Sequence, residues 1–197
     1  MRRARIRQTC PAMEDTRERI LLATLRLIGE QGVGAVTNRR VATAAGVALG
    51  SLTYHFPSQA ELLRETLSRY VDEEIHRISE IAARLQGITP DEAVVETERA
   101  IAELPSDPEE VATLELHLHA SRDPLVREAA VRSMEAYDRL ATAILTALGI
   151  PEPEAKAPTV VALLYGLAVR RLATGDPSGT AEALRLLLYG AATPHSD

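Results

Sequence analysis

Residues 37–56 contain the side chains of this sequence that are best suited to contact a nucleic acid. Thr37 and Asn38 precede Arg39 and Arg40, and a set of small hydrogen-bonding residues follows: Gly50, Ser51, Thr53 and Tyr54. Hydroxyl and amide groups hydrogen-bond to phosphate oxygens and base edges, and arginine adds charge attraction. The stretch therefore predicts a surface that contacts a polyanion. As structure alone, Thr37 is a helix cap and the arginines are a solvated face.

The same stretch predicts two short helices joined by a glycine turn. The first can begin after Thr37 and end before Gly46, where glycine permits a sharp change of direction. The second runs over about 48–54. Two short helices meeting at such a turn form the helix-turn-helix pattern, whose second helix lies in the major groove of DNA.

Residue spacing orients this second helix. Leu52 and Phe56 are four residues apart, so we expect both to face a small core. Gly50 and Tyr54 then point outward, with Ser51 and Thr53 on the flanks. The outward face is small and polar, which suits close approach to a phosphate backbone.

Charge is distributed unevenly along the chain of 197 residues, whose net charge is −6. Residues 1–56 carry nine arginines and four acidic residues, whereas residues 57–197 carry thirteen Lys or Arg and twenty-four acidic residues. A basic end joined to an acidic remainder suggests that one end meets a polyanion. The alternative is that local charge only keeps the helices soluble.

Composition and helix-start signals predict an all-α fold of about nine helices. Aromatic residues make up 3% of the chain, and Ala, Leu, Arg and Glu dominate. The first helix is expected to start at an Asp15 cap with Glu18 reaching back, and to stop at Gly32 and Gly34. A long helix opens at Ser58, others open near Thr89, Asp107 and Asp123, and the last two span about 156–173 and 180–191. Residues 149–158 are expected to be a loop or a ragged helix start.

Residues 16–63 resemble the DNA-binding domain of the TetR family of bacterial transcriptional repressors. The resemblance lies in the Val-Ala-x-x-Ala-Gly-Val of 41–47, the Gly-x-Leu-x-Tyr-His-Phe of 50–56 and the Ser-x-x-Glu-Leu-Leu of 58–63. It implies a basic flexible arm over 1–13, a three-helix DNA-binding domain over 14–60, a helical effector-binding and dimerisation domain over 61–192, and a tail over 193–197.

The resemblance also implies which residues contact DNA. Carried over by position, they are Thr37, Asn38, Arg39, Ala48, Leu49, Gly50, Ser51, Thr53, Tyr54, His55, Ser58 and Gln59, and Arg40 adds charge beside them. Thr53 stands where the family often has an aromatic residue, and Gln59 where it often has a lysine that contacts phosphate. The arm arginines Arg2, Arg3, Arg5 and Arg7 could compensate, or could form only a basic tail.

The acidic remainder offers weaker signals. Candidates for an effector pocket are His117, Tyr137, Tyr165 and Arg170, each of which could equally be structural. The resemblance places a dimer interface on the last two helices, with candidates Ala162, Gly166, Leu184, Leu187, Leu188 and Ala191; in a monomer these would be core. His117 and His119 lie on different helix faces, Glu115 and His119 lack an identifiable third ligand, and neither a metal site nor a cofactor is expected.

The sequence thus predicts a homodimeric, ligand-responsive repressor that binds a palindromic DNA operator and is released by an unknown small-molecule effector. One alternative is a helix-turn-helix protein controlled by a protein partner, and another is a helical enzyme, although no nucleotide loop, nucleophile elbow or zinc motif is present. Without a signal peptide, and with its longest apolar run at 160–169, the chain is expected in the bacterial cytoplasm, at the nucleoid and away from membranes.

Overall fold

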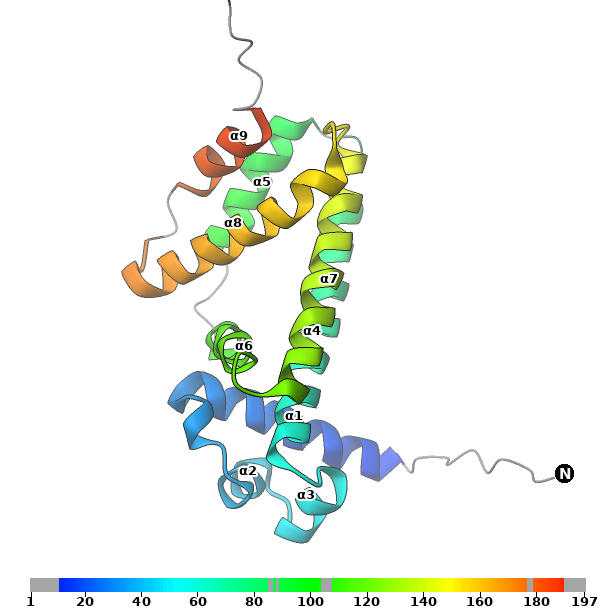
Figure 1. Cartoon of the computed structure of the whole chain (residues 1–197), viewed down its shortest axis with the longest axis vertical. Helices are drawn as coiled ribbons and strands as arrows, with labels where there is room; N and C mark the ends of the chain where they lie inside the picture. Colours follow the sequence, from blue (N-terminus) through cyan, green and yellow to red (C-terminus); the bar gives the residue numbers. More distant parts are fainter. Residues whose placement is uncertain (1–10, 85–86, 88, 104–107, 177–178, 190–197) are drawn as a thin grey trace, which may run out of the picture. The chain divides into compact units, whose positions relative to one another are not determined.

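The computed structural model describes residues 11–84, 87, 89–103, 108–176 and 179–189, and within these ranges the fold is all-α (Figure 1). Over the described residues, nine α-helices follow one another as predicted, together with one 3-10 turn that was not predicted. They are α1 (Pro11–Gln31), η1 (Val33–Ala35), α2 (Asn38–Ala45), α3 (Leu49–His55), α4 (Gln59–Arg84), α5 (Pro90–Glu103), α6 (Pro108–His119), α7 (Pro124–Ala147), α8 (Pro153–Thr174) and α9 (Thr180–Tyr189).

Several helices begin where capping residues predict. At α5, the Thr89 amide donates to Glu92 Oε2 at 2.7 Å and the Glu92 amide donates to Thr89 Oγ1 at 3.3 Å, which is a reciprocal capping box. The hydrogen bond from the Thr89 amide, and then one from the Thr89 hydroxyl at 2.8 Å, hold the pKa of the Glu92 carboxyl below its ordinary value. At α7, Asp123 Oδ1 accepts from the Leu125 amide at 2.9 Å. The expected Asp107 cap lies outside the described residues.

Two helix starts differ from the sequence prediction. The Asp15 cap is wrong, because α1 already includes Pro11 and runs through Asp15. Proline is favourable in a first helical turn, and the residues after it are good helix formers. Glu18 does not reach back to a cap; its carboxylate accepts from Arg69 Nε at 2.5 Å. Likewise, α8 begins at Pro153, so the preceding loop is shorter than expected.

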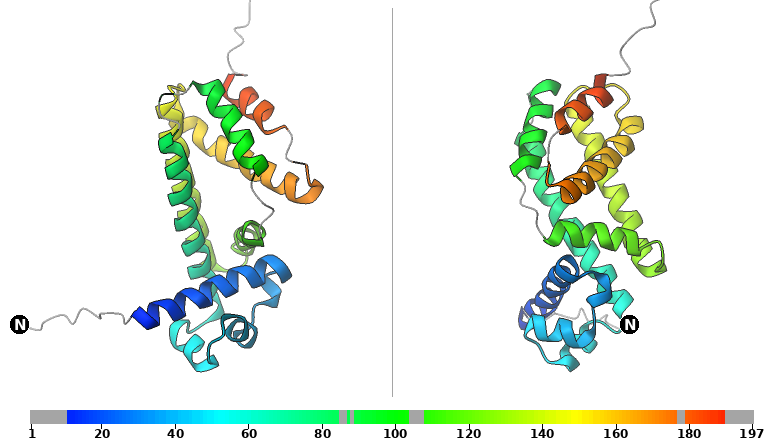
Figure 2. Two further views of the ribbon diagram at one scale, coloured as in Figure 1. Left: turned by 180° about the vertical axis from the view of Figure 1, so that it is seen from behind. Right: turned by 90° about the vertical axis from the view of Figure 1, so that its left-hand side faces the viewer.

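The chain forms two compact units, and the first combines residues 1–70 with residues 108–130. It holds α1, η1, α2, α3, the beginning of α4, α6 and the beginning of α7. Helix α6 packs against α1 (Figure 2). The largest fully buried side chains of this unit include Ile20, Leu21, Leu25, Ile28, Val41, Leu52, Phe56, Leu62, Leu63, Leu67, Leu116 and Val126.

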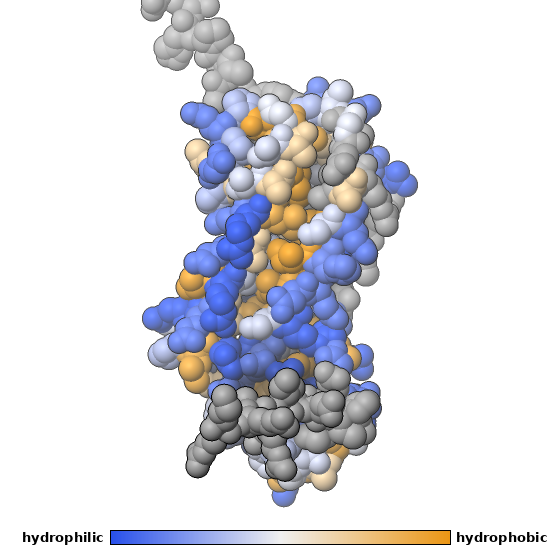
Figure 3. Space-filling view, turned by 90° about the vertical axis from the view of Figure 1, so that its right-hand side faces the viewer, coloured by the Kyte–Doolittle hydropathy of each residue, from blue (hydrophilic) through white to orange (hydrophobic). Residues whose placement is uncertain are grey.

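The second unit combines residues 71–107 with residues 131–197. Within it, α9 packs against both α5 and α8. Exposed polar residues line the outer faces of α4 and α7, and half-buried apolar residues, among them Ile75, Ile78, Leu140 and Ile144, belong to the same helices. Figure 3 shows this arrangement as an orange strip between blue ridges.

Candidate nucleic-acid interface

Helix α2 begins and ends as the sequence predicts. Thr37 caps it, since its hydroxyl oxygen accepts from the Arg40 amide at 3.3 Å. Gly46 ends it in the left-handed conformation with φ 63°. The Gly46 amide bonds to the Thr43 carbonyl and the Val47 amide to the Ala42 carbonyl, which together form a Schellman motif. This tight ending sets the direction in which the chain enters α3.

Arg19 of α1 supports the same turn from outside. Its guanidinium donates to the carbonyls of Ala45 at 2.6 Å and Gly46 at 3.0 Å. A cation near the last carbonyls of a helix is favourable both as a donor and against the helix dipole. Sequence reasoning missed Arg19, because no local pattern connects it with a turn 26 residues later.

Helix α3 is fixed from its inner side. Leu52 is fully buried and the Phe56 side chain is 2% exposed, as predicted. The Arg17 guanidinium lies 5.4 Å from the centre of the Phe56 ring, and it also pairs with Glu65 at 2.5 Å. The start of α1, the end of α3 and the beginning of α4 are therefore held at one point.

The outer side of α3 presents the predicted contact residues. Gly50, Thr53 and Tyr54 are exposed, Tyr54 by 69%, and Ser51 is half-buried. The Thr53 hydroxyl donates to the Gly50 carbonyl at 3.1 Å. The His55 ring meets the Tyr54 ring edge-on at 5.4 Å. A Cβ added to Gly50 would have nothing within 4 Å, so this part of the face is open.

The beginning of α2 forms the second part of the candidate interface. Thr37, Asn38, Arg39 and Arg40 are all exposed, and the helix N-terminus adds free amides and a positive dipole end. Arg40 also hydrogen-bonds to Gln31 of α1, which restrains its side chain. Ala48 and Leu49, at the start of α3, are exposed as well.

Ser58 and Gln59 also have structural partners at the beginning of α4. Ser58 Oγ accepts from the Glu61 amide at 3.0 Å and so caps the helix. Gln59 Nε2 donates to the Val36 carbonyl at 2.8 Å. The family resemblance implied DNA contacts for both residues, and the hydrogen bond of Gln59 to the chain before α2 was not foreseen. The arm arginines Arg2, Arg3, Arg5 and Arg7 lie outside the described residues.

The four pocket candidates are divided between the two compact units. Tyr137, Tyr165 and Arg170 belong to the second unit, whereas His117 belongs to the first. The Tyr137 hydroxyl donates to Glu74, and its ring meets the Tyr165 ring edge-on at 5.9 Å. Burial raises the pKa of Tyr137, and the nearby Glu74 carboxylate adds to the increase. Arg170 is exposed on α8. Glu74 was not foreseen.

His117, His119 and Glu115 have separate roles. His117 Nδ1 donates to the Thr113 carbonyl at 2.8 Å, and burial lowers the pKa of this imidazole. Glu115 Oε2 accepts from the Val33 amide at 2.8 Å, while His119 Nε2 lies 4.0 Å from Asp123. Within the described ranges, no group of three His, Cys, Asp or Glu side chains could hold a metal ion.

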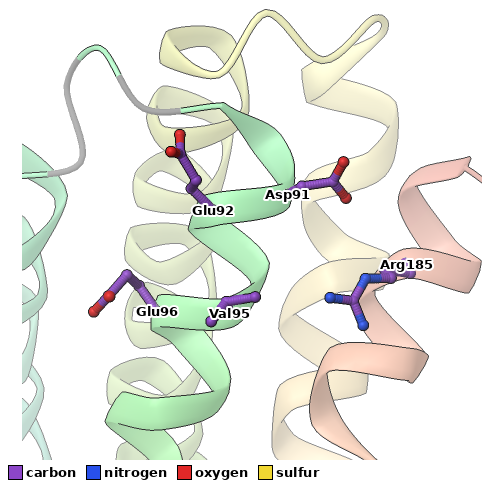
Figure 4. A pocket seen from close by; sticks show the side chains of 5 residues that line it. All are labelled: Asp91, Glu92, Val95, Glu96 and Arg185. Atoms are coloured by element: carbon purple, nitrogen blue, oxygen red, sulfur yellow. The ribbon is translucent and has the colours of Figure 1, made fainter.

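A groove of about 400 Å³ lies on the second unit between α5 and α9. It is lined by Asp91, Glu92, Val95, Glu96 and Arg185. In Figure 4, Asp91 and Arg185 point toward the space between the two helices. The sequence did not predict this groove.

Some of the candidates for the dimer interface lie among the described residues of α8 and α9. Ala162 and Gly166 are exposed on α8, and Val169 is exposed one turn further. Leu184 of α9 is buried within the chain itself, whereas its neighbour Leu186 is exposed. The side chains of Leu187 and Leu188, and the whole of Ala191, lie outside the described residues. None of the helices that the structure describes is long and apolar enough to cross a membrane.

A recognition helix anchored by Leu52 and Phe56, with exposed hydrogen-bonding residues outside and a capped basic helix before it, defines a helix-turn-helix DNA-binding regulator. Family models place it more narrowly. The model described as bacterial regulatory proteins, tetR family, matches residues 20–66, and the tetracyclin repressor-like C-terminal domain matches residues 89–191. The chain belongs to the TetR family of bacterial transcriptional regulators.

Individual proteins similar to this chain agree with the family assignment. The HTH-type transcriptional regulator CymR of Pseudomonas putida is 31% identical over 170 residues, which cover 82% of this chain and 81% of CymR. The crystal structure of SCO7518 from Streptomyces coelicolor A3(2) has a TM-score of 0.71 at 32% identity, and the match covers 91% of this chain and 99% of that one. The structure of the multidrug binding protein EbrR complexed with ethidium has a TM-score of 0.70 at 28% identity, and the match covers 87% of this chain and 96% of EbrR. The chain is thus a transcriptional regulator with a ligand-binding C-terminal domain, and not an enzyme.

Proposed function

We propose that this regulator is a homodimeric repressor that binds a palindromic operator on the bacterial chromosome and is released by a small-molecule effector. The observation that carries the proposal is the exposed Gly50–Tyr54 face of α3, which is supported from inside by buried Leu52 and Phe56. In this proposal α3 enters the major groove, and the amides and arginines at the start of α2 bind phosphate.

Two copies associate through α8 and α9 in the proposed dimer. Exposed Ala162 and Gly166 allow close approach between helices, and exposed Val169 and Leu186 add apolar surface. A two-fold axis through this surface would present two recognition helices to two half-sites. Buried Leu184 supports this surface from within. Leu187, Leu188 and Ala191 remain candidates for it from the sequence alone.

In this proposal the effector binds in the second unit, beside Tyr137 and Tyr165. The Glu74 carboxylate accepts a hydrogen bond from the Tyr137 hydroxyl there, so a carboxylate and two aromatic rings lie together. This combination suits a ligand with a positive charge and aromatic rings, and EbrR was crystallised with such a ligand, ethidium. Residues of α4 belong to both units, so a shift of α4 on ligand binding could reach the helix-turn-helix.

Glu74→Gln tests the effector placement. Fluorescence titration with ethidium should give binding to the unchanged protein and about tenfold weaker binding to the variant, because the carboxylate charge is lost. Glu80→Gln, an exposed carboxylate change on the same helix, should bind like the unchanged protein. Equal ethidium affinity of the Glu74 variant would exclude this site, and no binding at all would exclude an effector of this class.

Operator binding tests the main proposal. The purified protein should prefer the DNA flanking its own gene over random duplex, with two protomers per site at a fixed salt concentration. Tyr54→Ala should weaken this specific binding about tenfold or more, since an exposed contact is removed without touching the core. Leu118→Ala, at an exposed position on α6, should bind normally.

The possible failures have separate meanings. Absence of any preference for that DNA would contradict a local operator, and normal binding by Tyr54→Ala would show that the contact face is misassigned. One protomer per site would contradict the dimer.

A further inference from the structure

Residues 32–36 connect α1 to the first proposed DNA contact. Gly32 has φ 82°, η1 follows, and Val36 is 2% exposed immediately before Thr37. Because Val36 is anchored and Thr37 caps α2, a displacement of this segment would carry the N-terminus of α2 with it. The position of that N-terminus decides whether its amides and arginines reach phosphate.

Two side chains from other helices hold the ends of this segment. Glu115 of α6 accepts from the Val33 amide at 2.8 Å, and Gln59 of α4 donates to the Val36 carbonyl at 2.8 Å. Both hydrogen bonds are partly buried, and each satisfies a backbone group that has left the regular pattern of α1. Glu115 is also close to Gly32, where an added Cβ would stand 3.4 Å from its carboxylate.

The two side chains come from different parts of the regulator. Glu115 lies within the residues matched by the ligand-binding domain, 89–191, whereas Val33, Val36 and Gln59 lie within those matched by the DNA-binding domain, 20–66. The Glu115–Val33 hydrogen bond therefore connects the two domains directly, inside one compact unit.

We propose that Glu115 and Gln59 are positioning residues that set the N-terminus of α2 for DNA, and that Glu115 makes DNA affinity depend on the position of α6. The inference needs DNA binding by this family member, and it extends the proposed function by naming the residues that transmit a change in α6. In this role Gln59 replaces a phosphate contact by a hydrogen bond inside the protein.

The effect of charge on DNA affinity distinguishes a positioning role of Glu115 from a purely electrostatic one. Removing a carboxylate from a DNA-binding unit should strengthen its attraction to a polyanion. Loss of positioning acts in the opposite direction, so Glu115→Ala should bind the operator about tenfold more weakly despite its more positive charge. Glu115→Gln retains an acceptor oxygen for the Val33 amide and should stay within about threefold of the unchanged protein. Glu128→Ala, an exposed carboxylate change in the same unit, should bind equally or more tightly.

The experiment measures operator and random-duplex affinity for these variants and for Gln59→Ala, at a temperature where circular dichroism shows each to be folded. Glu115→Ala and Gln59→Ala should both lose operator affinity. Random-duplex affinity should stay unchanged in Gln59→Ala and be equal or higher in Glu115→Ala, because non-specific binding tolerates altered geometry and depends on charge. Operator affinity of Glu115→Ala equal to or above that of the unchanged protein would overturn the proposal.

Amide exchange gives a readout that needs no DNA. The Val33 amide should exchange at least tenfold faster in Glu115→Ala than in Glu115→Gln, as followed by NMR. If the unchanged protein shows no operator preference, the proposed function fails and this measurement alone decides the positioning role. Equal exchange in the two variants would overturn it.

Discussion

Phe56→Ala should lower the free energy of unfolding of the first unit by about 3–5 kcal/mol. The ring is 2% exposed, ends α3 and lies under the Arg17 guanidinium, so its removal leaves a cavity and releases that arginine. Thermal unfolding followed by circular dichroism should show a midpoint lower by about 10 °C. Specific DNA binding should fall with it, because α3 loses one of its two inner anchors.

Tyr54→Ala is the matched control for this change. Tyr54 is two residues away on the same turn and 69% exposed, so its removal should leave the unfolding midpoint nearly unchanged while weakening DNA binding. An unchanged midpoint for Phe56→Ala would mean that the ring does not anchor α3.

Gly29→Ala should disturb the packing of α6 on α1. A Cβ at this position would stand 1.8 Å from the backbone carbonyl oxygen of Pro108, much closer than any allowed contact. Backbone at the start of α6 must move, and we expect a loss of about 3 kcal/mol in the free energy of unfolding. Urea unfolding followed by circular dichroism measures this loss.

Gly34→Ala controls for the general effect of replacing a glycine. An added Cβ there has nothing within 4 Å, so the variant should unfold near the same urea concentration as the unchanged protein. Equal midpoints for the two variants would show that α6 is not fixed at Gly29.

The helix-turn-helix could be predicted because its signals are local. Gly46 ends α2, and the spacing of Leu52 and Phe56 alone fixes which side of α3 faces inward. The same local reasoning failed at Asp15, where a capping residue lies inside a helix that starts earlier. A capping residue can cap only where the helix actually begins, and favourable residues before it extended α1.

The supports of the interface could not be predicted, because they join residues far apart in the chain. Arg19 reaches Ala45 and Gly46, Glu115 reaches Val33, and Gln59 reaches Val36. No spacing rule relates such pairs without a fold. The pocket candidates had the same difficulty: residue type singled out Tyr137 and Tyr165, while their neighbour Glu74 became visible only through packing.

The packing of α6 on α1 also bears on how such regulators can be recombined. The first unit is discontinuous, since residues 108–130 complete what residues 1–70 begin. A chimera that joins this DNA-binding domain at residue 60 to the ligand-binding domain of another regulator would discard α6 and uncover the α1 surface at Gly29. Exchange of ligand-binding domains, by engineering or by gene fusion, should therefore keep residues 108–130 together with the DNA-binding domain. The alternative is a foreign α6 that packs closely against Gly29 and supplies a carboxylate to the Val33 amide.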